Sequence, residues 1–157
     1  MSDHTPWLTR IAEALERLAP PPPPPVDWLA HPAYVWLGRT ARPVVRLEAP
    51  ALDLMHGIDF QKGAVVENVA RLAHGTAAHD MLLWGSRGMG KSALLRAATL
   101  AAQNDRPGSI ALVQATPEAG LADLFALLRG IDRRFLVFLD DLGFDAADAD
   151  GARRLRS

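Results

Sequence analysis

A glycine-rich run, GSRGMGKS at residues 85–92, constrains the fold of this chain more than any other feature. It directly follows four apolar residues, 81–84, and directly precedes a stretch with helical periodicity, residues 91–104. A short, continuous apolar run is typical of a strand that is covered on both faces, so the pattern predicts a strand, a tight turn and a helix. A strand that leads directly into a helix is typical of a parallel sheet with crossover helices.

The spacing of this run matches G-x-x-x-x-G-K-[ST], a phosphate-binding pattern. Gly85, Gly88 and Gly90 allow the backbone to curl so that its N–H groups point toward phosphate oxygens. The ammonium group of Lys91 adds a positive charge at the β and γ phosphates, and the hydroxyl of Ser92 can ligate Mg²⁺. The alternative is a glycine turn that precedes a basic helix start by chance, but the strand and helix around the run favour phosphate binding. The predicted nucleotide-binding residues here are Gly85, Ser86, Arg87, Gly88, Met89, Gly90, Lys91, Ser92 and Ala93.

Two acids close a second apolar run, FLVFLDD at residues 135–141. The run fits the Walker B strand of a nucleotide-binding sheet, and the chain between the two motifs leaves room for one strand and two crossovers. Asp140 would then hold magnesium through its water shell, while Asp141 would orient or deprotonate an attacking water. Two acids after a buried strand are otherwise a polar strand end. We therefore predict Ser92 and Asp140 as metal ligands and Lys91 and Asp141 as catalytic residues.

Strands and helices alternate around these motifs. Residues 61–74 place apolar side chains on one helical face and are followed by Gly75, a typical helix end. Residues 110–113 predict a strand, and residues 117–129 predict a helix. The alternation predicts an α/β fold with a parallel sheet and right-handed crossover helices. Ligands bind such sheets at the carboxyl ends of the strands, where both motifs lie.

The N-terminal part has a different character. Residues 7–18 place apolar side chains at helical spacing opposite charged ones, which predicts an amphipathic helix. Its apolar face would pack on its own domain, on a partner or on a membrane surface. Six prolines at residues 20–25 predict a polyproline II rod of about 19 Å, at about 3.1 Å per residue. The rod serves either as a stiff spacer or as a ligand of an SH3-type domain.

Residues 26–51 contain scattered prolines and predict an irregular packed segment with a short extended piece at residues 44–47. The aromatic side chains of Trp28, Tyr34 and Trp36 are expected to be buried anchors rather than a ligand cage. The chain is thus predicted to consist of a helix and linker (residues 1–25), this packed segment (residues 26–51) and an ATP-binding domain (residues 52–157).

Composition narrows the classes of partner. The 157 residues are 49% hydrophobic, and 17 basic and 18 acidic residues give a formal net charge of −1. Charges of both signs are mixed along the chain, so no field favours nucleic acid or an anionic membrane. The chain has no cysteine, which excludes disulfides and thiolate zinc sites. With no signal peptide and no apolar run of membrane-spanning length, a cytoplasmic location is expected.

Three segments carry a resemblance to a known family: GIDFQKGAVVENVARLAHG, LLWGSRGMGKSALLRA and FLVFLDDLGFD. Together they resemble a bacterial family of AAA+-type predicted ATPases, P-loop proteins catalogued as a domain of unknown function, over about residues 52–157. The family has two aspartates at the end of its Walker B strand, which fits Asp141 at a position where many ATPases carry glutamate. The resemblance also implies that the segment before the first helix lies against the adenine, which adds Ile58 to the nucleotide-binding residues. A turn with a helix-entry contact is the alternative for that segment.

The resemblance implies further elements that this sequence does not contain. AAA+ domains continue past Walker B with a strand that ends in a polar sensor residue, an arginine finger and a helical lid, whereas this sequence stops at Ser157. We therefore expect a P-loop domain that is incomplete at its C-terminus. In the family's sheet order, the missing strand lies between the strands at residues 81–84 and 135–139.

The sequence thus favours an ATP-binding protein, an ATPase of the AAA+ type that hydrolyses ATP with Mg²⁺. The alternative is a nucleotide-binding module, or a truncated fragment, that does not hydrolyse ATP because the sensor and arginine finger are absent. A small-molecule kinase has less support, because no lid with arginines is visible. Further copies of the chain and an unidentified client protein are left open as partners, and adenine is favoured over guanine because no N-K-x-D motif follows Walker B.

Overall fold

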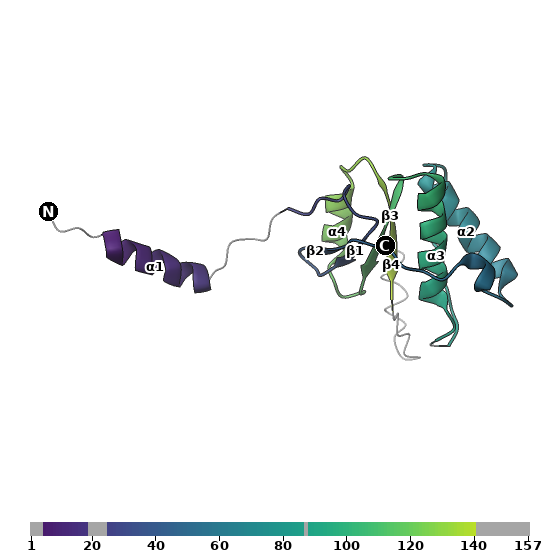
Figure 1. The fold of residues 1–157 in the computed structure, drawn as a ribbon, viewed down its shortest axis with the longest axis horizontal. Coiled ribbons are helices and arrows are strands. Elements are labelled where there is room, and N and C mark those ends of the chain that lie inside the picture. Colours follow the sequence, from purple (N-terminus) through teal and green to yellow (C-terminus); the bar gives the residue numbers. More distant parts are fainter. Residues whose placement is uncertain (1–4, 19–24, 87, 141–157) are drawn as a thin grey trace.

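The computed structural model describes residues 5–18, 25–86 and 88–140. A four-stranded sheet in the order β2-β1-β3-β4 forms a central layer (Figure 1). Helix α4 covers one face of the sheet, and helices α2 and α3 cover the other. The chain therefore has an α/β architecture. Its elements are α1 (Thr5–Leu18), β1 (Ala33–Trp36), β2 (Ala41–Val44), the 3₁₀ turn η1 (Leu52–Leu54), α2 (Asp59–Ala73), α3 (Lys91–Asp105), β3 (Ile110–Ala115), α4 (Leu121–Leu128) and β4 (Arg134–Leu139).

The sheet is mixed, which corrects the expectation of a purely parallel one. Strands β1, β3 and β4 run parallel, but β2 pairs antiparallel with β1. This β1–β2 hairpin lies within the segment that the sequence predicted to be irregular. A hydrogen bond from the Leu37 N–H to the Thr40 carbonyl closes its turn, and Gly38 supplies the positive φ of 90°. Pro43 is tolerated because β2 is an edge strand, where a missing N–H donor costs little.

The predicted strand at residues 81–84 does not form, and this expectation was wrong. Met81, Leu82 and Trp84 are exposed by 42%, 61% and 89%, and only Leu83 is half-buried, against the core between α2 and α3. A strand needs the hydrogen-bonding groups of a neighbour at about 4.8 Å. Among the described strands, none pairs with this run. Its apolar character therefore did not suffice to make it a strand.

The two faces of β4 bury alternate side chains. Leu136 and Phe138 pack toward α2 and α3, whereas Phe135, Val137 and Leu139 pack toward α4. This alternation follows from the two-residue repeat of a strand. Because both faces are covered, β4 is a nearly continuous apolar run, as the sequence predicted.

Aromatic side chains and one arginine hold β1 and the segment before it in place against the rest of the sheet. Trp28, Tyr34 and Trp36 are buried, which confirms their predicted role as anchors. The guanidinium of Arg133 donates hydrogen bonds to the carbonyls of Trp28, Leu29 and His31 at 3.1, 3.2 and 2.7 Å. It also donates to the Ile110 carbonyl at 2.9 Å, so one side chain ties the segment before β1 to β3.

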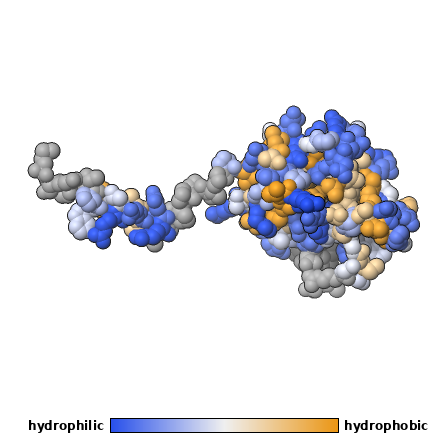
Figure 2. All heavy atoms as spheres, in the orientation of Figure 1, coloured by the Kyte–Doolittle hydropathy of each residue, from blue (hydrophilic) through white to orange (hydrophobic). Residues whose placement is uncertain are grey.

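Helix α1 forms as predicted, but its apolar side chains lie open. Trp7, Leu8, Ile11 and Leu15 are exposed by 62%, 64%, 55% and 59%. In the view of Figure 2, no other described segment covers α1. None of the helices within the described residues has the length and apolar character needed to cross a bilayer.

Candidate functional site at the carboxyl edge of the strands

The direction of α3 places the glycine-rich loop, residues 85–90, at the carboxyl edge of the sheet. Helix α3 ends at Asp105, and β3 begins at Ile110 after a short turn. The helix is about 22 Å long at 1.5 Å per residue, and β3 is about 20 Å long. Since α3 packs along β3 and runs against it, the start of α3 lies near the end of β3. Parallel strands β1 and β4 end at the same edge.

The glycines of this loop adopt backbone angles that other residues avoid. Gly85, Gly88 and Gly90 have φ angles of 139°, 83° and 81°. Within the part of the chain that the structure describes, no atom beyond the adjacent residues lies within 4 Å of the position that a Cβ would occupy at any of the three, so their conformation rather than crowding explains the residue type. The loop residues Ser86 and Met89 are exposed. The loop is thus an open turn whose backbone faces solvent, and Arg87 lies outside the described residues.

Lys91 and Ser92 begin α3 directly after this turn, where the helix leaves N–H groups without intrahelical partners. The Lys91 ammonium donates hydrogen bonds to the carbonyls of Gly85 at 2.8 Å and Ser86 at 3.0 Å. It therefore lies at the loop rather than over the sheet. Ala93 is half-buried like Ser92, as the helix turns from the loop toward the core.

Asp140 follows β4 at the same edge. Its N–H donates to the Ala115 carbonyl at 3.4 Å, and its side chain accepts a 3.4 Å hydrogen bond from the amide of Gln114. The alternation of β4, with Leu136 and Phe138 on the α3 side, continues to Asp140. The metal ligand predicted from sequence thus shares both an edge and a face with α3. Asp141 lies outside the described residues.

The segment before α2 reaches the same core as the loop. Met55 and Ile58 pack on the cluster that also holds Leu83 and the first turns of α3. Ile58 and Leu83, which lies two residues before the glycine-rich loop, therefore pack on the same apolar cluster. In the same cluster, Leu94 lies two residues after Ser92, and Phe138 lies two residues before Asp140.

Lys62 shapes this segment, a role that we did not predict from the sequence. Its ammonium donates to the carbonyls of Met55 at 2.9 Å and Leu52 at 3.3 Å, and it pairs with Asp59 at 2.9 Å. The hydrogen bond and charge of Lys62 lower the pKa of the Asp59 carboxyl. The sequence feature that could have predicted this role is the spacing of three residues between Asp59 and Lys62 at the start of a helix.

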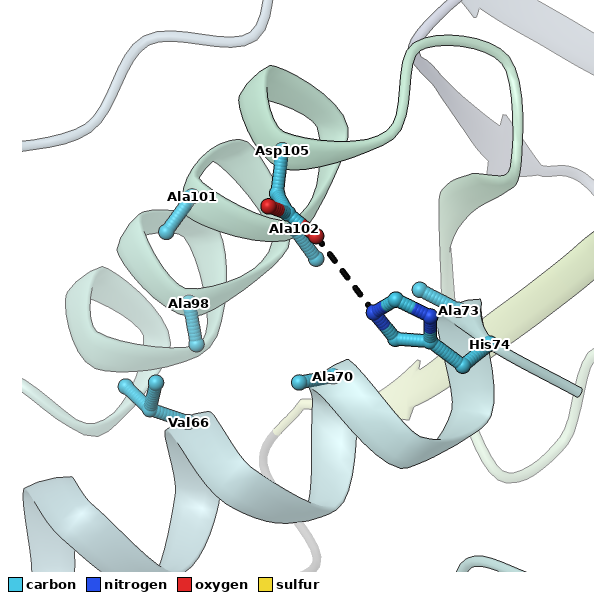
Figure 3. A pocket seen from close by; sticks show the side chains of 8 residues that line it. All are labelled: Val66, Ala70, Ala73, His74, Ala98, Ala101, Ala102 and Asp105. Atoms are coloured by element: carbon cyan, nitrogen blue, oxygen red, sulfur yellow. Dashed lines mark ion pairs between the residues drawn. The ribbon is translucent and has the colours of Figure 1, made fainter. Parts of the chain in front are cut away.

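A second feature is a hollow of about 160 Å³ between α2 and α3 (Figure 3). Alanines line most of it, and His74 and Asp105 form an ion pair of 3.4 Å at one end. Asp105 ends α3, whereas Lys91 begins it, so the hollow extends toward the opposite end of the helix. Its wall of Ala70, Ala98 and Ala101 offers no donors for phosphate.

Comparison with known proteins identifies the family of the chain. The model of the DUF815 family, described as a protein of unknown function, matches residues 29–157, and the chain belongs to this family. No significantly similar protein was found among curated proteins or solved structures. The matched residues include both the glycine-rich loop and Asp140.

Proposed function

We propose that this DUF815 chain is an ATP-binding protein of the P-loop class, and that it acts as an AAA+-type ATPase with Mg²⁺. One observation carries the proposal: the GSRGMGKS segment turns on three glycines of positive φ directly before α3, with Lys91 at the turn. A helix N-terminus behind such a turn directs backbone N–H groups and a positive end of the helix dipole at a bound anion. The open space at the glycines leaves the backbone accessible to phosphate oxygens.

The residues around the loop fit a magnesium-bound triphosphate. Ser92 carries a hydroxyl in the first turn of α3, and Asp140 supplies a carboxylate on the same side of the sheet. Oxygen ligands of this kind suit Mg²⁺, which binds proteins through few groups and keeps several waters. Bound there, Mg²⁺ would neutralise charge on the β and γ phosphates. Asp141 is the proposed residue that orients the attacking water.

A nucleotide-binding module without turnover is the second candidate. The observation in its favour is the unpaired run at residues 81–84, whose side chains are largely exposed. No strand among the described residues pairs with this run, so strand pairing does not fix the distance between the entry to the loop and Asp140. Catalysis requires such positioning more strictly than binding does, because reacting groups must be held within a fraction of an ångström.

Titration of the full chain with ATP in the presence and absence of Mg²⁺, together with phosphate release, tests the proposal. We expect Asp140→Asn to remove most of the magnesium dependence and to lower affinity for Mg-ATP roughly tenfold, since a charged ligand is lost. Asp132→Asn is the matched control, because exposed Asp132 precedes β4 at the opposite edge. If ATP binds but no magnesium-dependent phosphate release is observed, the chain is a nucleotide-binding module without turnover. If ATP does not bind, or if both variants lose affinity equally, the proposed site is wrong.

A further inference from the structure

Helix α1 presents a face of large apolar side chains for which the rest of the described chain offers no cover. The exposed fractions of Trp7, Leu8, Ile11 and Leu15 all exceed one half. Exposed apolar surface of this kind marks an interaction site, and a helix of 14 residues alone is marginal in water. The apolar face of α1 is therefore a candidate interaction surface.

The spacing along α1 indicates which kind of surface fits it. Leu8, Ile11 and Leu15 are separated by three and then four residues, and Leu18 follows three residues later in the sequence. This is the a and d pattern of two heptads, the seam of a coiled coil. Ala12 and the half-buried Ala14 occupy the adjoining e and g positions, where small side chains let helices approach closely.

The charges beside the seam differ between its two flanks. Arg10 and Arg17 occupy c positions on the flank of Trp7, and the guanidinium of Arg10 lies 5.1 Å from the centre of the Trp7 ring. Glu16 occupies a b position on the other flank. When identical helices pack in parallel, unlike flanks meet, so the basic flank of one lies beside the acidic flank of the next. In an antiparallel pair, the flanks that carry Arg10 and Arg17 would instead lie beside each other, which places like charges together.

We propose that α1 is covered by the α1 helices of other copies of this chain, packed in parallel through Leu8, Ile11 and Leu15. The charge of α1 supports this partner over a lipid surface. Its two arginines balance Glu13 and Glu16, so the helix carries no net charge to attract an anionic membrane. The proposal concerns assembly and does not depend on nucleotide binding.

Cysteine cross-linking tests the direction of packing, because the chain has no native cysteine. In a parallel assembly, a d residue faces its own counterpart, so full-length Ile11→Cys should form a disulfide-linked dimer under mild oxidation. Glu13→Cys, on the opposite side of the helix, is the control and should cross-link at least several-fold more slowly. Equal rates for the two variants would overturn the proposal. Efficient cross-linking only in a mixture of Ile11→Cys with Leu15→Cys chains would overturn the parallel arrangement.

Sedimentation equilibrium of the full chain tests the association itself. We expect concentration-dependent self-association that Leu15→Asp abolishes and Glu13→Asp leaves intact. Because α1 contributes nothing to the core, Leu15→Asp should leave the melting temperature of the sheet region unchanged, which separates lost association from misfolding. A full-length chain that stays monomeric at high concentration would contradict the proposal. So would binding of monomers to vesicles of anionic lipid, or a Leu15→Asp variant that associates as the original chain does.

Discussion

The ammonium nitrogen of Lys91 lies 2.8 Å from the carbonyl oxygen of Gly85, so the first residue of α3 is bonded to the first residue of the loop before it. The Ser86 carbonyl accepts a second hydrogen bond from the same ammonium. Both acceptors are neutral carbonyls. A phosphate oxygen carries more negative charge and forms a stronger bond to an ammonium, so a bound phosphate would compete for Lys91.

Lys91→Ala is expected to weaken ATP binding without disturbing the fold, because the side chain contacts the loop rather than the core. A hydrogen bond to a charged group contributes about 1.5 to 3 kcal/mol, which corresponds to a loss of roughly tenfold to a hundredfold in affinity. Calorimetric titration measures this, with far-UV circular dichroism as the check on folding. Arg106→Ala removes the same charge just after the far end of α3 and should bind normally. Unchanged affinity of Lys91→Ala would remove the phosphate-binding assignment.

Replacing Gly63 or Gly90 with alanine should change the free energy of unfolding in opposite directions, although both glycines have free space around them. Gly63 lies within α2, so Gly63→Ala should stabilise the protein by about 0.5 to 1 kcal/mol through reduced unfolded-state entropy. Gly90 has a φ of 81°, where a Cβ costs about 1 to 2 kcal/mol. Urea unfolding measures both changes. If Gly90→Ala were as stable as Gly63→Ala, the left-handed backbone conformation of Gly90 before α3 would be contradicted.

Tyr34 should make stability fall in alkaline solution. Its hydroxyl donates to the Asp27 carbonyl at 2.6 Å and accepts from the His31 N–H at 3.1 Å. Burial raises the pKa of the Tyr34 phenol above its ordinary value of 10.0. The unfolded chain therefore releases this proton first, and the free energy of unfolding should decline as the pH rises above about 10.

Tyr34→Phe separates this effect from general alkaline unfolding. At neutral pH the variant should lose about 1 to 3 kcal/mol, because the Asp27 carbonyl and the His31 N–H lose their partner. Above pH 10 its stability should decline less steeply than that of the original chain. Parallel pH profiles for the two proteins, measured by urea unfolding, would contradict a buried neutral Tyr34.

Arg133→Met should destabilise the protein by about 2 to 4 kcal/mol, because it leaves carbonyl groups of the segment before β1 and of β3 without their donor. Methionine keeps much of the apolar stem of arginine, so the change in the free energy of unfolding reports mainly the loss of the guanidinium. Arg129→Met, at an exposed position after α4, should change the free energy of unfolding by less than about 0.5 kcal/mol. Equal losses for the two variants would show that Arg133 does not tie these segments together.

Deletion of residues 1–25 is expected to leave nucleotide affinity unchanged, because no residue of α1 belongs to the candidate site. Binding of a fluorescent ATP analogue to the shortened chain measures this, and far-UV circular dichroism checks that the α/β layers remain folded. Loss of binding in a folded protein would place α1 in the pocket.

The sequence by itself determined the elements that have a strong periodicity of their own. Residues predicted as helix at 61–74 and 91–104 correspond to α2 and α3, and the apolar run before Asp140 is β4. The turn at Gly85, Gly88 and Gly90 was also predictable, because positive φ angles select glycine. Periodicity and special backbone angles are local properties, so they can be inferred from neighbours in the chain.

Only the tertiary structure decided which runs became strands and what surrounds the candidate site. Residues 81–84 have the composition of a strand but no described partner, whereas β2 contains Pro43 and pairs because it lies at an edge. The Gln114 amide donates a hydrogen bond to the Asp140 carboxylate, and this contact depends on the register of the neighbouring strands β3 and β4. Strand pairing and cross-strand contacts depend on hydrogen-bonding groups supplied from distant parts of the chain, and local sequence does not encode where those groups will lie.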